Sequence, residues 1–86
     1  MKVTFDEKAF AEYISWQSED KKTLARINEL IKSIQREGLM KGIGKPEVLK
    51  NRKEYSRRID AKNRLVYIGD SEQNLIILSC KGHYEE

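Results

Sequence analysis

The sequence predicts an α+β fold with a short N-terminal strand, a helical hairpin and then an antiparallel sheet meander. Apolar residues recur at helical spacing before Gly38, whereas short apolar runs separated by polar turns follow Tyr55. Helical segments followed by strands in this order are typical of the α+β class. Because 86 residues suffice for one small core, residues 1–86 are expected to form a single domain.

The N-terminal segment predicts a brief edge strand that leads into a helix. Residues 1–5 alternate between apolar and polar side chains, which is typical of a strand. Asp6 has the right chemistry for an N-cap, and Phe5 and Phe10 have the spacing of a hydrophobic staple around it. An amphipathic helix is therefore expected over residues 6–18.

A second helix is expected to begin at a cap provided by Ser18 or Asp20 and to end at Gly38. It should pack with the first helix as a hairpin on one face of the sheet, with its apolar stripe in the core. That stripe consists of Leu24, Ile27, Leu30, Ile31 and Ile34.

The remainder of the chain predicts a loop and three strands. Glycine and proline make residues 38–53 a loop. Strands are expected over residues 55–60, 64–68 and 75–82, and the short connections make neighbouring strands antiparallel.

The positive charge is concentrated in the middle of the chain. Residues 41–64 hold nine basic and three acidic residues, a balance of +6, whereas the other eight basic and eleven acidic residues give −3. This asymmetry favours binding of a polyanion at one place, although a solvated basic loop would have the same composition.

Cysteine and histidine content excludes several classes of site. The single cysteine, Cys80, cannot form an internal disulfide and is expected to be a small buried hydrophobe; the single histidine, His83, cannot build a zinc cluster. No apolar leader or membrane-spanning run is present, so a cytoplasmic protein is expected. Trp16 is expected to lie in the core or to face a partner.

Alternation along a strand places the two neighbouring arginines of the predicted 55–60 strand on opposite faces of the sheet. Ser56 and Arg58 should share one face of the strand, and Arg57 should lie on the other. One face of the sheet must take the helices, which leaves the other face free to be a site. Antiparallel pairing also places Arg64, at the start of one strand, at the same sheet edge as His83, after the end of the next.

A carboxylate, an arginine and a histidine at one end of a basic sheet suit metal-free RNA cleavage. Glu47 could act as the base for a 2′-hydroxyl, His83 as the acid for the leaving 5′-oxygen and Arg64 as the stabiliser of phosphorane charge. Each residue also has an ordinary explanation. Glu47 could form a surface ion pair, His83 could be solvated, and Arg64 could pair with Asp60 across the turn.

The order of several motifs resembles the YoeB/Txe family of the RelE/ParE toxin superfamily. The motifs are GKPEVLK at residues 44–50, YSRRI at residues 55–59, RLVY at residues 64–67 and HY at residues 83–84. With matching N-terminal segments, the resemblance covers essentially the whole chain and implies a RelE-like, microbial-ribonuclease-type fold.

The resemblance implies a toxin that cleaves mRNA in the ribosomal 30S A site without a metal or other cofactor. It assigns Glu47 as general base, His83 as general acid and Arg64 as the phosphate-stabilising residue. It also implies substrate contacts, which would be made by Tyr84, Lys50 and Arg58.

The same resemblance implies protein partners. A YefM-like antitoxin would neutralise the toxin and join it in binding operator DNA, and the toxin could form a homodimer. Two alternatives stay open from the sequence: a ParE-like, non-enzymatic poison of DNA gyrase, and an inactive partner that only binds antitoxin and operator.

Overall fold

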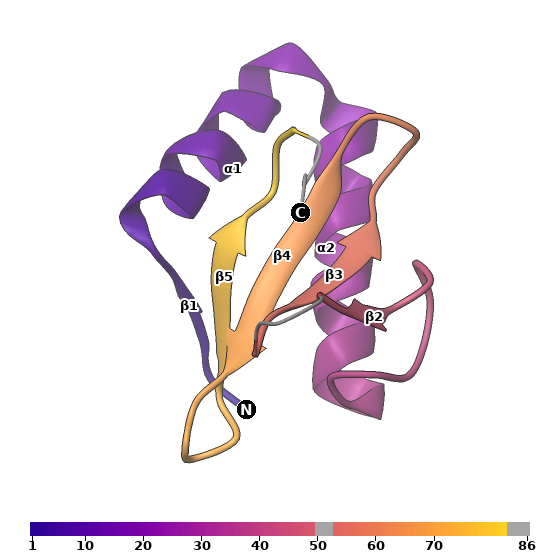
Figure 1. Ribbon diagram of the computed structural model, residues 1–86. Helices are drawn as coiled ribbons and strands as arrows, with labels where there is room; N and C mark the ends of the chain where they lie inside the picture. Colours follow the sequence, from indigo (N-terminus) through magenta and orange to yellow (C-terminus); the bar gives the residue numbers. More distant parts are fainter. Residues whose placement is uncertain (50–52, 83–86) are drawn as a thin grey trace.

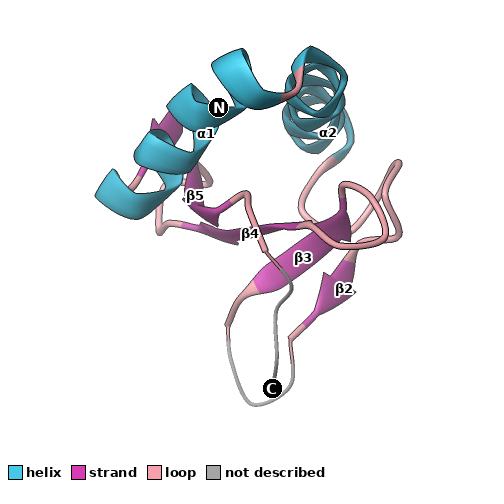
Figure 2. Ribbon diagram, turned by 90° about the horizontal axis from the view of Figure 1, so that it is seen from above, coloured by secondary structure: helices cyan, strands magenta, loops and turns pink. Residues whose placement is uncertain are grey.

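The computed structural model describes residues 1–49 and 53–82 and has two helices packed on one face of a five-stranded sheet (Figures 1 and 2). This arrangement confirms the predicted α+β class. The elements along the chain are β1 (Val3–Phe5), α1 (Glu7–Glu19), α2 (Lys21–Glu37), β2 (Glu47–Val48), β3 (Tyr55–Arg58), β4 (Arg64–Gly69) and β5 (Leu75–Ser79).

The strands lie in the order β1-β5-β4-β3-β2. The meander β3–β4–β5 is antiparallel, as predicted. β1 is an edge strand, also as predicted, and it runs parallel to β5 with Val3 opposite Leu75, a direction that the sequence left open. The sheet is therefore mixed.

The prediction of a continuous loop over residues 38–53 was wrong at β2. Glu47 and Val48 pair antiparallel with Ser56 and Tyr55 and form the other edge of the sheet. Two residues are too few to show an alternating pattern, so only the neighbouring strand reveals this one.

Local capping explains where α1 begins. Asp6 Oδ1 accepts a hydrogen bond from the Ala9 backbone N–H at 3.0 Å, and the Phe5 and Phe10 rings meet edge to face with centroids 6.3 Å apart. The predicted cap and staple are both confirmed.

Asp20 rather than Ser18 caps α2, which begins at Lys21. Asp20 Oδ1 accepts from the N–H groups of Lys22 and Thr23 at 3.0 and 3.3 Å. Hydrogen bonds from the Thr23 hydroxyl and backbone lower the pKa of Asp20. Gly38, with φ of +104°, ends the helix as predicted.

The core lies between the helices and the sheet. Trp16 and Cys80 are both buried there, as predicted, and the indole Nε1 donates to the Cys80 carbonyl at 2.9 Å. The predicted stripe of α2 supplies Ile27, Leu30 and Ile34, which are fully buried. No helix in the described ranges combines the length and the apolar character needed to cross a membrane.

Two predicted strands end earlier than expected. β3 stops at Arg58 instead of residue 60 because the turn begins there, and β5 stops at Ser79 instead of residue 82. A bulge lies near the end of β5, where Val66 faces Ser79 but the next residue, Tyr67, faces Ile77.

Candidate active site

Neighbouring arginines on β3 point to opposite faces of the sheet. Arg57 is fully buried on the helix side, whereas Arg58 is exposed on the open side. Ser56 is buried but lines a hollow on that same open side. The structure thus confirms the division predicted from strand alternation. It leaves one arginine of this pair at the surface on which a substrate could lie.

Strand register brings three of the predicted residues into one hollow. Arg58 lies directly opposite Arg64 on β4, and Glu47 lies directly opposite Ser56. Paired residues share a face of the sheet, so all four side chains border the same space. The hollow has a volume of about 100 Å³ and is lined by Lys45, Glu47, Ser56, Arg58 and Arg64.

The charges in this hollow favour an anionic ligand. Like charges directly opposite each other across two strands destabilise a sheet, and Arg58 and Arg64 form such a pair. A bound phosphate would remove this repulsion and accept paired hydrogen bonds from the guanidinium groups. Glu47 adds an acceptor at the rim, where its Oε1 receives the Ser56 hydroxyl at 3.4 Å.

The loop before β2 brings Lys45 and Glu47 to this place. Gly44 has φ of +87°, and a Cβ there would lie 2.6 Å from Cδ2 of the buried Leu30. Only glycine lets the loop approach α2 so closely. The Gly44 carbonyl also accepts the Arg58 N–H at 2.7 Å, which joins the loop to β3 beside the hollow.

Arg64 is held by main-chain acceptors. Its Nη1 donates to the carbonyl oxygens of Asp60 and Asn63 at 2.8 and 3.1 Å. The suggested pairing with Asp60 therefore exists, but through the carbonyl rather than the carboxylate.

The Asp60 carboxylate is occupied within its own turn. It accepts hydrogen bonds from Asn63 and from the Lys62 N–H. Although desolvation opposes ionisation, these hydrogen bonds and the nearby Arg64 charge together lower the pKa of Asp60. The carboxylate is therefore ionised at neutral pH and remains a hydrogen-bond acceptor.

The chain that leads to His83 passes beside Arg64. The Arg64 N–H donates to the Gly82 carbonyl at 3.0 Å, so the residue before His83 lies at the start of β4. This agrees with the sheet edge inferred from antiparallel pairing. His83 itself, Tyr84 and Lys50 lie outside the described residues.

Two residues of the hollow were not predicted as site residues. Ser56 was placed on the correct face, but nothing in the sequence showed that it would face a carboxylate. Lys45 belongs to the GKPE segment and the basic region, and its φ of +52° is uncommon for a residue other than glycine. Its positive charge and its place beside Pro46 were the only signals available.

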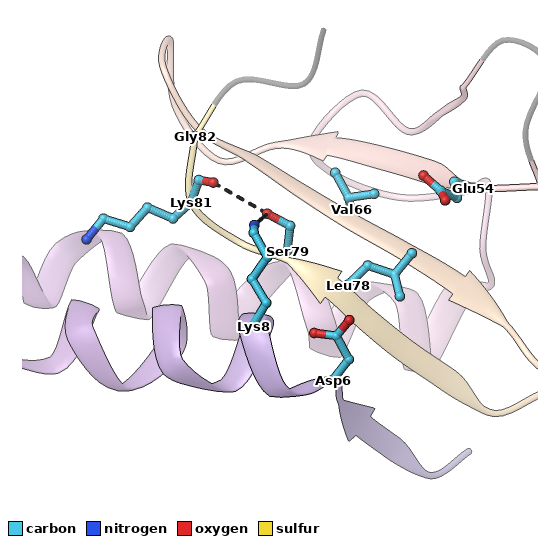
Figure 3. Close-up of a pocket in the computed structure, with 8 residues that line it drawn as sticks. All are labelled: Asp6, Lys8, Glu54, Val66, Leu78, Ser79, Lys81 and Gly82. Atoms are coloured by element: carbon cyan, nitrogen blue, oxygen red, sulfur yellow. Dashed lines mark hydrogen bonds between the residues drawn. The ribbon is translucent and has the colours of Figure 1, made fainter. Parts of the chain in front are cut away.

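A larger hollow of about 370 Å³ opens on the same face, nearer β5 (Figure 3). Val66, the register partner of Ser56, and Leu78 give it apolar walls, whereas Asp6, Glu54 and Lys8 add charges of both signs. Lys81 Nζ points away from it, toward α1, where it contacts Glu19. The described residues contain no cluster of three metal-ligating side chains in this hollow or elsewhere.

Comparison with known proteins agrees with the geometry. A family model described as the YoeB-like toxin of bacterial type II toxin–antitoxin systems matches residues 5–84. The chain is 48% identical over 87 residues to Toxin YoeB of Synechocystis sp., with 99% of each chain covered. It also resembles the solved YoeB dimer from Staphylococcus aureus (TM-score 0.90) and the heterotetrameric YoeB–YefM toxin–antitoxin complex of that organism (TM-score 0.89), with 49% identity and 98% of both chains covered in each case.

Proposed function

The chain belongs to the YoeB-like toxins of bacterial type II toxin–antitoxin systems, and on this premise we propose that residues 1–86 form a single domain that cleaves mRNA in the ribosomal A site. The observation that carries this proposal is the Arg58–Arg64 pair beside Glu47. These groups match the two needs of 2′-hydroxyl attack, which are an acceptor for a proton and donors for a phosphate.

In the proposed reaction Glu47 takes the proton of the 2′-hydroxyl, and the freed oxygen attacks the adjacent phosphorus. Arg64 and Arg58 donate hydrogen bonds to the non-bridging oxygens as negative charge builds on them. The bond from phosphorus to the 5′-oxygen then breaks, and His83 gives its proton to that oxygen. The products are a 2′,3′-cyclic phosphate and a 5′-hydroxyl.

Three of the proposed roles rest on the sequence resemblance. His83 would be the general acid, Tyr84 would stack on a base beside the cleaved phosphate, and Lys50 would contact the backbone. The hydrogen bond from Arg64 to Gly82 supports the role of His83, because it brings the preceding residue to the strand that bears the phosphate-binding guanidinium. Chemistry of this kind needs no metal.

We further propose that the toxin is held inactive by an antitoxin. YoeB of S. aureus assembles with YefM and also forms a dimer. By similarity, a YefM-like antitoxin would bind this chain, the complex would bind operator DNA, and the free toxin could form a homodimer. Since its proposed substrate is translated message, the toxin would act in the cytoplasm.

Cell-free translation tests the proposal. Purified protein is added to a reaction that translates a defined message, and primer extension maps the new 5′-ends. We expect cuts within translated codons, and no cuts when ribosomes are omitted. Glu47→Gln and His83→Gln should each slow cutting by roughly a hundredfold or more.

Glu29→Gln is the matched control, because this carboxylate is exposed on α2 and should leave cutting unchanged. Full-length message alongside arrested translation would contradict the proposal. DNA breaks that depend on gyrase would instead support a gyrase poison.

A further inference from the structure

The turn between β3 and β4 is closed by one side-chain pair. Asp60 Oδ1 accepts the backbone N–H groups of Lys62 and Asn63 at 2.8 and 2.7 Å. Both Asp60 carboxylate oxygens also accept from Asn63 Nδ2, each at 3.1 Å. These bonds orient the Asn63 amide and leave its oxygen as an acceptor beyond the turn.

The Asn63 oxygen binds the C-terminal segment. It accepts the Gly82 N–H at 2.8 Å, while the Gly82 carbonyl accepts the Arg64 N–H at 3.0 Å. Asn63 of the turn and Arg64, the first residue of β4, therefore hold both main-chain polar groups of Gly82. Gly82 has φ of +95°, a conformation that favours glycine, and it directly precedes His83.

The same turn also holds the Arg64 side chain. Nη1 donates to the Asp60 and Asn63 carbonyl oxygens, and every side-chain hydrogen bond that Arg64 makes within residues 1–49 and 53–82 comes from this one nitrogen. The orientation of the guanidinium and the position of Gly82 thus depend on a single four-residue turn.

We propose that Asp60 and Asn63 are positioning residues that hold the Arg64 guanidinium and Gly82, the residue that precedes His83 in the sequence. This inference rests on the proposed ribonuclease function, because it assigns the turn a role in that reaction. Neither residue lines the hollow that Glu47, Arg58 and Arg64 border. Asn63 holds Gly82, which is next in sequence to the proposed general acid, and Asp60 orients Asn63.

A second turn provides a matched control at the opposite end of the sheet. Asp70 Oδ1 accepts the N–H groups of Glu72 and Asn74 at 2.8 and 2.9 Å, and Asn74 Oδ1 accepts the Lys2 N–H at 2.8 Å. Asn74 therefore bridges a turn and a distant backbone amide much as Asn63 does, but within the described residues it makes no hydrogen bond to Glu47, Arg58 or Arg64.

The test compares Asn63→Ala with Asn74→Ala in the cell-free cleavage assay, with full-length protein. We expect Asn63→Ala to lower kcat by roughly a hundredfold, as a small misplacement of catalytic groups does, while KM changes less than about twofold. Asn74→Ala should leave both constants within about twofold of wild type, even if it lowers the urea midpoint of unfolding as much as Asn63→Ala does. Asp60→Ala combined with Asn63→Ala should slow the reaction no more than Asn63→Ala alone, because the two residues act as a unit.

Amide hydrogen exchange tests the link between Asn63 and Gly82 without a measurement of RNA cleavage. The Gly82 N–H should exchange faster in Asn63→Ala than in wild type and should be unaffected by Asn74→Ala. Wild-type protein that cuts no message would refute the proposed function, whereas this exchange experiment would still report on the link. Equal kcat values in the two alanine variants, or unchanged Gly82 exchange, would overturn the positioning role.

Discussion

Cys80 shows how burial determines the chemistry of a single residue. Its side chain is fully buried, and its backbone N–H donates to Glu12 Oε1 at 2.8 Å. Desolvation, reinforced by the Glu12 charge, raises the pKa of the thiol to about 12. Since only the thiolate is a nucleophile, Cys80 is inert in the folded protein.

The raised pKa predicts a specific pH dependence of stability. In the unfolded chain the thiol ionises at pH ~8.5. Between about pH 9 and 12 the folded state therefore keeps a thiol proton that the unfolded state has lost. The contribution of Cys80 to the free energy of unfolding is therefore complete below this window. It falls by up to ~1.4 kcal/mol per pH unit as the pH rises through the window. Urea unfolding at pH 8 and pH 10.5 measures it.

Cys80→Ala serves as the reference for that measurement, because tyrosines and lysines also titrate in this window. We expect the free energy of unfolding to fall less steeply with pH in the variant than in wild type. The same slope in both proteins would show that the thiol does not contribute.

At the scale of an element, the loop between α2 and β2 is held by one buried arginine. Arg57 Nη2 donates to the carbonyl oxygens of Gly38 and Lys41 at 2.9 and 2.6 Å, and Nη1 donates to the Ile43 carbonyl at 2.9 Å. Its Nε donates to the Tyr67 hydroxyl at 2.9 Å. The buried charge is solvated by main-chain oxygens, and the loop that carries Lys45 and Glu47 is fixed at its base.

Replacing Arg57 should therefore destabilise the whole protein. Arg57→Met removes a donor from three partly buried carbonyl groups and from the Tyr67 hydroxyl, which we expect to cost on the order of 3 kcal/mol of unfolding free energy. Arg58→Met, one position along the same strand but exposed, should change stability by less than about 0.5 kcal/mol. Urea denaturation followed by circular dichroism measures both, and equal losses would contradict the assigned role of Arg57.

At the scale of the whole molecule, the sheet separates the hydrophobic core from the face that we propose binds RNA. The helices cover one face and form the core with it (Figure 2), whereas the open face presents Arg58 and Arg64. Both arginines lie within residues 41–64, which carry the net charge of +6, and together with Lys45 they outnumber Glu47 in the hollow on this face. Only the basic residues on this face should then contribute to the salt dependence of the affinity for a polyanion.

Salt dependence of RNA binding measures this separation. For a fluorescent single-stranded RNA blocked at its 2′-hydroxyls, the logarithm of affinity should fall linearly with the logarithm of salt concentration. Lys45→Gln should reduce that slope by about 0.7, the value for one phosphate contact on a single strand. Lys21→Gln, at the start of α2, should leave the slope unchanged. Equal effects of both variants would indicate diffuse attraction instead of a site.

Prediction from sequence succeeded where the signal is local. Caps such as Asp6 and the stop at Gly38 depend on atoms within one helical turn, and the opposite orientations of Arg57 and Arg58 follow from the pleat of a single strand. The grouping of Arg64 with the chain before His83 needed only short antiparallel connections. These features would hold for any packing of the elements.

Tertiary structure decided what joins distant segments. β2 exists because Glu47 pairs with Ser56, and the direction of β1 is set by its pairing with β5. The hydrogen bonds from Arg57 to the Ile43 carbonyl and from Gly82 to Asn63 join residues that no local pattern relates. The sequence by itself thus determined the helices, the meander, the faces of its strands and the candidates Glu47, Arg58 and Arg64. Only the fold decided that these three side chains share one hollow, because the register between segments depends on how the whole core packs.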